Sequence, residues 1–188
     1  EATAKNGKWN EAPGKALFGA IRKVFPDAKI IAEDLGFITE DVRELLADTD
    51  FPGMKVLQFG FYDEDSEYLP RMFETDNCIV YASTHDSDCT RSWYASLDED
   101  ALARFKRECG RKKGQSPTYA TIECAMVSRA NLAMIAMQDY MELTNEQGRM
   151  NVPSRAEGNW AWRVSCRYAT QKLRDAIREM TVTTGRAK

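Results

Sequence analysis

Short apolar segments that alternate with amphipathic helical segments are the feature that most constrains the fold of this chain. Strands that alternate with helices form parallel sheets through right-handed crossovers. The sequence therefore predicts an α/β fold with a parallel sheet. Four runs have the length of a buried strand: residues 29–32, 54–59, 78–82 and 132–137.

Each predicted strand leads into residues that can face a ligand. Glu33 follows the first strand, Asp86 follows the third, and Gln138 follows the fourth, while residues 58–63 follow the second. The carboxyl ends of successive parallel strands are where (β/α)8 barrels carry their chemistry. Such a barrel takes about 250 residues. The sequence therefore predicts about half a barrel, and we expect residues 1–188 to form one partial catalytic domain.

Helical segments lie between and after the strands. Apolar residues recur at helical spacing in them, and Pro or Ser residues mark several of their ends. We expect a capping box over Ser96–Glu99, because a Ser followed three residues later by Glu is its signature. The expected helices cover residues 14–25, a segment from about 39, 96–109, 116–130 and a final segment around 168–180.

Composition bounds the classes of function. Lys and Arg total 26 against 29 Asp and Glu, and the net charge of −3 argues against a nucleic-acid or anionic-membrane partner. Apolar runs fall well short of the roughly 20 residues that span a membrane. The amino terminus lacks the pattern of a signal peptide. The chain begins with Glu rather than Met, which indicates a piece of something longer.

The cysteines and acidic runs favour neither a metal nor a cofactor. Five cysteines without a CxxC pair predict free thiols in a reducing compartment. His85 is the single histidine. A calcium loop starting at Asp63 would need glycine where Tyr68 stands, and the run from Asp86 lacks that glycine as well. We therefore expect no metal and no organic cofactor.

Five ordered strings give the sequence a family resemblance. Together they resemble the carboxyl-terminal half of a 4-α-glucanotransferase, the amylomaltase or disproportionating enzymes of glycoside hydrolase family 77. The resemblance covers residues 7 to 180. The strings are Ala32–Gly36, Phe51–Phe59, Thr84–Asp86, Arg149–Pro153 and Gly158–Arg163.

The resemblance implies a TIM-type barrel with strands five to eight in this chain, and it implies roles for particular residues. Glu33 corresponds to the acid/base and Asp86 to the third acid. His85 and Phe59 correspond to sugar-binding residues, and Asn151 lies in a loop on the acceptor side. The implied reaction is a retaining double displacement. It passes a segment of an α-1,4-glucan to the 4-hydroxyl of an acceptor glucose or glucan.

Each of these residues also has a structural interpretation that needs no catalysis. Glu33 could serve as a cap or an ion-pair partner, and His85 as a hydrogen-bonded core residue. Phe59 could belong to the core, and Asn151 could be a turn residue.

The sequence departs from the family pattern at one decisive place. The family's nucleophile is an Asp in an Arg-x-Asp-His string on strand four, and this chain contains no such string. We therefore expect the isolated chain to be inactive. Smaller departures, such as Ser87 where the family has Asn, affect contact details.

Two alternatives stay open at this point. The chain could be a noncatalytic piece that binds maltooligosaccharides or self-associates through exposed half-barrel edges. It could also be an inverting α-glucan hydrolase that uses Glu33 and Asp86. Such an enzyme needs its carboxyls roughly 6.5–9.5 Å apart. The resemblance places the protein in a bacterial cytoplasm or in a plastid.

Overall fold

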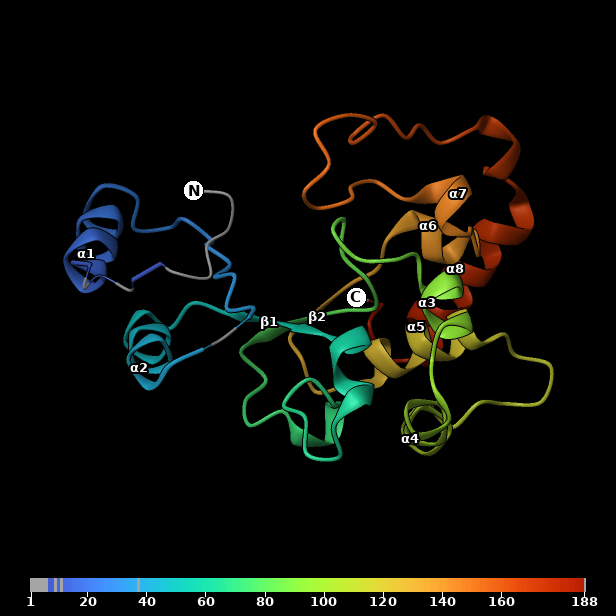
Figure 1. Ribbon diagram of the computed structural model, residues 1–188, viewed down its shortest axis with the longest axis horizontal. Helices are drawn as coiled ribbons and strands as arrows, with labels where there is room; N and C mark the ends of the chain where they lie inside the picture. Colours follow the sequence, from blue (N-terminus) through green and yellow to red (C-terminus); the bar gives the residue numbers. More distant parts are fainter. Residues whose placement is uncertain (1–6, 9, 11, 37, 188) are drawn as a thin grey trace. The chain divides into compact units, whose positions relative to one another are not determined.

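The structure is a computed structural model that describes residues 7, 8, 10, 12–36 and 38–187 (Figure 1). The chain divides into two compact units, residues 1–53 and 54–188, and each is described by itself. The first holds helices α1 (Gly14–Val24) and α2 (Glu40–Thr49). The second holds three strands and most of the helices. They are β1 (Gly53–Val56, at the junction), η2 (Leu57–Tyr62), η3 (Pro70–Met72), β2 (Cys78–Tyr81), α3 (Thr90–Ala95), α4 (Glu99–Cys109), α5 (Pro117–Val127), β3 (Leu132–Met134), α6 (Met137–Tyr140), α7 (Asn145–Gly148), η4 (Cys166–Tyr168) and α8 (Gln171–Thr183).

The first unit is a pair of helices packed on each other. Helix α1 ends at Val24, just before Phe25 and Pro26, and α2 begins directly after Thr39, as predicted. The ring of Phe18 meets that of Phe51 edge-on at 5.3 Å, and the Arg22 guanidinium lies 5.0 Å above the Phe51 ring. These contacts pack α1 against Phe51, in the segment that follows α2.

The strand predicted over residues 29–32 is wrong. The segment lies in irregular backbone, and Ala32 donates one hydrogen bond to the carbonyl of Pro52 at 3.0 Å. Ile31 stays 41% exposed. A strand forms by pairing along a ladder, and a single bond of this kind does not make one.

The three strands of the sheet lie in the order β1-β2-β3. Strands β2 and β3 run parallel, with Val80 opposite Ala133. Residues Cys78–Val80 of β2 are buried, as expected for a strand covered on both faces. The predicted α/β fold with parallel pairing is therefore present, built from three strands rather than four.

Two predicted strands are shorter than the apolar runs that suggested them. After Val56 the chain turns into η2, which buries Leu57 and Phe61 on one side of a helical turn. After Met134 the chain leaves the sheet and enters α6, where Asp139 and Tyr140 are buried. Both apolar runs therefore change from strand to helical backbone before they end, which the run of apolar residues alone does not show.

The core of the second unit is aromatic at its centre. Phe61 lies 5.4 Å from both Trp93 and Phe105, measured between ring centroids. Helix α5 lies between this cluster and a second one around Ile122, and most of its residues are buried. Helix α8 packs onto the second cluster. Arg186, just after α8, donates to the carbonyls of Met126, Ser128 and Ala130 at the end of α5.

The capping box predicted at Ser96 is also wrong. Ser96 ends a helix that the sequence analysis missed, α3, and its hydroxyl donates to the carbonyl of Trp93 at 2.7 Å. Asp98 caps α4 instead by accepting from the N–H of Ala101 at 2.8 Å. Ser96 directly follows α3 and α4 begins only three residues later, so the Ser96 hydroxyl bonds to the end of α3 and does not cap α4.

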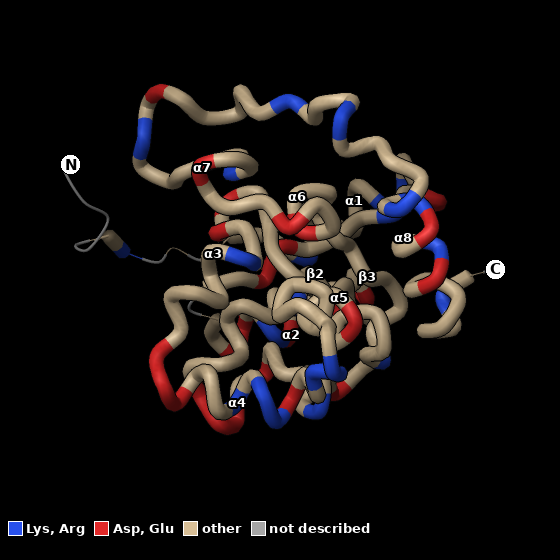
Figure 2. Tube along the Cα trace, turned by 90° about the vertical axis from the view of Figure 1, so that its right-hand side faces the viewer, with Lys and Arg blue, Asp and Glu red and all other residues tan. Residues whose placement is uncertain are grey.

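Charged residues of both signs are interspersed along α4 (Figure 2). Its exposed arginines pair with Glu64 across the surface; the Arg107–Glu64 distance is 2.7 Å. Across the part of the chain that the structure describes, no helix is long and apolar enough to cross a membrane.

Candidate functional site

The loop that follows β2 carries two of the predicted site residues. Residues 82–89 connect β2 to α3, and His85 and Asp86 lie in the middle of the loop. The His85 Nε2 atom is 3.3 Å from Asp86 Oδ1, and both side chains are about half exposed. The pair is therefore open to a ligand from solvent.

Asn151 joins this pair from a distant part of the chain. Its side-chain amide donates to Asp86 Oδ1 at 2.5 Å, and its backbone N–H donates to the carbonyl of His85 at 3.1 Å. The structure thus brings together three residues that the sequence analysis selected separately. A carboxylate, an imidazole and an amide that share one exposed surface suit hydrogen bonding to sugar hydroxyls.

Arg149 and Asn145 hold the same loop from behind. The Arg149 guanidinium pairs with the carboxylate of Asp88 and reaches the carbonyl of Asp86 at 3.3 Å. Asn145 donates to Asp88 Oδ1 at 2.8 Å and accepts from the N–H of Cys89 at 2.9 Å. These side chains give the loop a fixed course without regular secondary structure.

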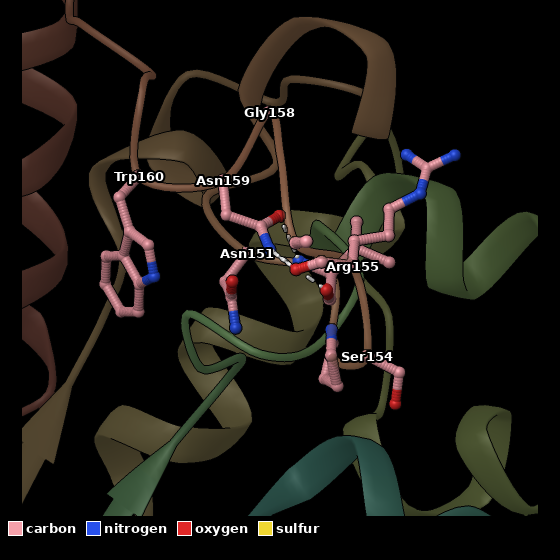
Figure 3. A pocket seen from close by; sticks show the side chains of 9 residues that line it. Asn151, Ser154, Arg155, Gly158, Asn159 and Trp160 are labelled. Atoms are coloured by element: carbon pink, nitrogen blue, oxygen red, sulfur yellow. Dashed lines mark hydrogen bonds between the residues drawn. The ribbon is translucent and has the colours of Figure 1, made fainter. Parts of the chain in front are cut away.

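A pocket of about 300 Å³ is lined by Asn151 and by eight further residues between positions 152 and 160 (Figure 3). Asn159 shapes it by accepting from the N–H of Val152 and donating to two carbonyls of the loop. Trp160, at the end of this segment, lies with its ring 5.1 Å from that of His85. Its backbone has φ +60°, which non-glycine residues adopt uncommonly. Its N–H bond to the carbonyl of Met150 at 2.8 Å supports that conformation.

Phe59 and Glu33 occupy other places. Phe59 lies on η2, 42% exposed, with its ring edge-on to Tyr68 at 5.5 Å. Glu33 belongs to the first unit, where it is exposed in irregular backbone. Asp34, beside it, faces Gly53, where an added Cβ would overlap its carboxylate.

Sequence reasoning missed Asp139. It selected Gln138, but the neighbouring Asp139 is the buried residue, 1% exposed. Its carboxylate accepts from the Ser83 hydroxyl at 2.5 Å and from the Thr90 N–H at 2.8 Å. Burial raises the pKa of this carboxyl, and the bonds from Ser83 and Thr90 oppose part of the rise. The sequence signal was present, since an acid that directly follows an apolar run is unusual unless it has partners.

The described residues contain no group of three or more His, Cys, Asp or Glu side chains able to hold a metal ion. The acidic run from Asp63 instead forms a local turn, in which Asp63 accepts from the N–H of Asp65 at 3.2 Å. None of the five cysteines, all within the described residues, forms a disulfide.

Comparisons with known proteins point to one family. A sequence model of the family described as 4-alpha-glucanotransferase, glycoside hydrolase family 77, matches residues 1–169. The 4-alpha-glucanotransferase of Aquifex aeolicus is 44% identical over 173 residues, 92% of this chain and 35% of the relative. A chloroplastic/amyloplastic 4-alpha-glucanotransferase of Arabidopsis thaliana is 39% identical over 184 residues, 96% of this chain and 32% of the relative.

A solved structure gives the same indication for the fold. The amylomaltase of Streptococcus agalactiae in complex with acarbose matches with a TM-score of 0.92 and 34% identity, over 99% of this chain and 38% of that one. The match confirms the predicted fold class, part of the α/β barrel of such an enzyme. The chain spans about a third of the length of the curated relatives it matches.

Proposed function

The chain belongs to the 4-alpha-glucanotransferases of glycoside hydrolase family 77, and from this we propose that it forms part of an enzyme that rearranges α-1,4-glucans. The reaction moves a glucan segment to the 4-hydroxyl of an acceptor glucose or glucan. The observation that carries the proposal is the cluster of His85, Asp86 and Asn151, three family positions joined by hydrogen bonds on one exposed surface.

We assign separate tasks to the two acids. Asp86 binds hydroxyls of the sugar at the cleavage point, and bonds to those hydroxyls strengthen as the ring distorts toward an oxocarbenium-like transition state. Glu33 gives a proton to the leaving oxygen and later takes one from the incoming hydroxyl. The assignment of Glu33 rests on its place in the Glu-Asp-Leu-Gly string.

The acceptor side follows from the pocket next to the cluster. Transfer in place of hydrolysis requires that a sugar reach the reacting carbon and that water stay out. Trp160 offers an exposed ring beside His85, and Asn151 offers an amide at the pocket edge. Aromatic rings stack against the apolar faces of sugars while polar groups bind the hydroxyls. Phe59 supplies a second exposed ring for the glucan.

The isolated chain should not complete the reaction. A retaining mechanism needs a nucleophilic carboxylate that forms a covalent glycosyl intermediate, and this sequence lacks the family string that carries it. Removing one member of a group that acts as a unit abolishes most of its effect. We therefore propose that residues 1–188 act as one partial catalytic domain, without a metal or organic cofactor, in a bacterial cytoplasm or a plastid.

A chimera tests the proposal. The chain is joined to the part of the Aquifex aeolicus relative outside the matched segment, and maltotriose disproportionation is followed through glucose release and longer maltodextrins. The chimera should be active and the chain alone inactive. Glu33→Gln should lower the activity of the chimera by about 10²- to 10⁴-fold, the usual contribution of general acid–base catalysis. Glu40→Gln, at an exposed acid in the first turn of α2, is the matched control.

The result separates this proposal from its rivals. Activity of the chain alone would contradict the missing nucleophile. A chimera that folds and binds glucan but is unaffected by Glu33→Gln would contradict the assigned acid/base. An inverting hydrolase would release a product of inverted anomeric configuration, which proton NMR detects.

A noncatalytic glucan-binding module is the second candidate, favoured by the exposure of the His85 and Asp86 side chains and of Trp160. Titration of the chain with maltoheptaose, followed by calorimetry, measures this binding. Size-exclusion mass shows whether the chain associates with itself. Binding by a chain that stays inactive in the chimera would favour the module.

A further inference from the structure

A single buried carboxylate holds both ends of the loop that carries His85 and Asp86. Asp139 accepts at one oxygen from the hydroxyl of Ser83, near the start of the loop, at 2.5 Å. It accepts at the other oxygen from the N–H of Thr90, the first residue of α3 directly after the loop, at 2.8 Å. Ser83, Thr90 and Asp139 are each at most 5% exposed.

A carboxylate suits this position because it has two acceptor oxygens. Each oxygen of an ionised carboxylate accepts without donating, so one side chain can hold two donors that are seven positions apart. A buried carboxylate is costly unless such bonds compensate for the lost water. Gln58 completes the set by donating to the carbonyl of Asp88 at 2.9 Å and to the Thr90 hydroxyl at 3.4 Å.

Asp139 lies on the protein side of the loop, away from the exposed cluster. Its contacts are with the loop ends, while the exposed atoms of His85 and Asp86 meet Asn151 and Trp160. Asp139 can therefore affect the site only by fixing the backbone conformation of the loop that carries His85 and Asp86. Arg149, Asn145 and Gln58 hold residues between Asp86 and Thr90, whereas Asp139 bonds to both Ser83 and Thr90 and so links the two ends of the segment.

We propose that Asp139 is a positioning residue that fixes residues 83–90 so that His85 and Asp86 face the glucan. The expected effect on glucan binding rests on the proposed function. The expected effect on the loop does not, because it follows from the hydrogen bonds alone.

Cys89 provides a probe inside the loop. Its thiol is 5% exposed, and burial raises its pKa to about 12, with the charges of Asp139 and Asp88 adding to the rise. Iodoacetamide therefore reaches this thiol only when the loop opens. Cys78 and Cys124 are also buried but lie in β2 and α5, so their labelling reports opening of the core. Peptide mass spectrometry measures each site separately.

Asp139→Ala should raise the labelling rate of Cys89 by about tenfold or more, since bonds to a charged acceptor are among the stronger ones. Cys78 and Cys124 should keep their rates. Asp139→Asn retains an oxygen for the Thr90 N–H and an amide that the Ser83 hydroxyl can accept from, so it should restore slow labelling to within about threefold. Ser83→Ala, a milder change, should give an intermediate rate.

The alternatives give different patterns. If all three buried thiols are labelled faster together, Asp139 supports the fold as a whole and the proposal is wrong. If Asp139→Asn labels Cys89 as fast as Asp139→Ala, the effect comes from the lost charge on the thiol and the proposal is again wrong. Leu69→Ala, a fully buried core change away from the loop, calibrates general destabilisation.

A maltoheptaose titration then connects the loop to the site. Asp139→Ala should weaken binding by about tenfold, Asp139→Asn should bind nearly as the unaltered chain, and Leu69→Ala should leave binding unchanged where the chain is folded. If no variant and no unaltered chain binds glucan, the proposed function fails in the isolated chain while the labelling result still decides the loop. If Asp139→Ala opens the loop but binds normally, the positioning role is overturned.

Discussion

The side-chain amide of Asn151 donates to the carboxylate of Asp86 at 2.5 Å, while the backbone N–H of the same residue donates to the carbonyl of His85. One residue therefore orients both a side chain and the backbone next to it. The amide also leaves its own oxygen available, so it can keep Asp86 in place and still accept from a sugar hydroxyl.

Replacing Asn151 tests this relationship directly. Asn151→Asp places a second carboxylate against Asp86, and like charges at hydrogen-bond distance repel. We expect it to weaken maltoheptaose binding by about tenfold or more, and Asn151→Ala to weaken it less, since it removes a bond without adding repulsion. Calorimetry measures both, with the exposed Asn131→Asp as a charge-matched control. Equal binding by Asn151→Asp and the unaltered chain would contradict the assignment.

We expect a side chain at Gly53 to destabilise the first unit. A Cβ there would overlap the carboxylate of Asp34, and overpacking of this kind costs typically about 1–3 kcal/mol. Gly53→Ala should lower the free energy of unfolding by that amount, measured by urea denaturation with circular dichroism. Gly19→Ala has open space within α1 and should stabilise by about 0.5–1 kcal/mol.

A double variant shows whether the clash is the cause. Asp34→Ala removes the carboxylate, so Gly53→Ala should cost much less in that background. If the two changes add without coupling, the overlap with Asp34 does not explain the loss.

Asp139 should make stability depend on pH in a defined direction. Because burial raises its pKa, the folded chain keeps the proton at pH values where the unfolded chain has lost it. The stability from this group is full below the ordinary Asp pKa of about 3.9 and is lost as pH rises through the folded-state pKa. The neighbouring Cys89 thiol, with its pKa of about 12, stays neutral in this range.

The measurement compares the unaltered chain with Asp139→Asn. Their difference in free energy of unfolding, unaltered minus variant, should fall as pH rises above about 4 and level off once Asp139 is ionised. Urea titrations at a series of pH values give this difference, in which the other carboxyls cancel. A difference that grows with pH would have the wrong sign.

Cysteine reactivity should be dominated by one thiol. Cys166 is exposed, whereas Cys78, Cys89 and Cys124 are buried, and the pKa of Cys109 is raised by its contact with Cys124 and by burial. A reagent must reach a thiol before it can react with it, so the exposure of Cys166 favours this residue. We expect one fast equivalent with Ellman's reagent, absent in Cys166→Ser. Two or more fast equivalents in the folded chain would be inconsistent with this burial pattern.

Most helices of the fold could be predicted from local signals. Pro13 and Pro26 bound α1, Glu40 and Asp41 lie in the first turn of α2, and the Ser116 hydroxyl accepts from the N–H of Tyr119 at the start of α5. These signals act within a few residues of each other, so the sequence contains them in readable form. The run at residues 29–32 failed for the opposite reason, because strand formation depends on a partner elsewhere in the chain.

In the candidate site too, residues in local sequence strings could be predicted and residues with distant partners could not. His85, Asp86 and Asn151 were selected because they stand in strings that resemble a family, and the structure brings these three together. Asp139 stands in no such string, and its importance comes from two donors 49 and 56 positions away. Long-range partners of this kind do not appear in local spacing.

The bonds that hold the His85 loop also set the order in which the protein can assemble. Asp139, Asn145 and Asn151 lie 49 to 66 positions beyond the residues of this segment that they bind. A chain emerging from the ribosome would therefore lack these bonds until residues 139–151 have cleared the exit tunnel, while the bonds from Gln58 to Asp88 and Thr90 can form earlier. Contacts between distant positions also form slowly. During synthesis, the loop that carries His85 would stay open to proteases and chaperones for longer than segments held by local contacts.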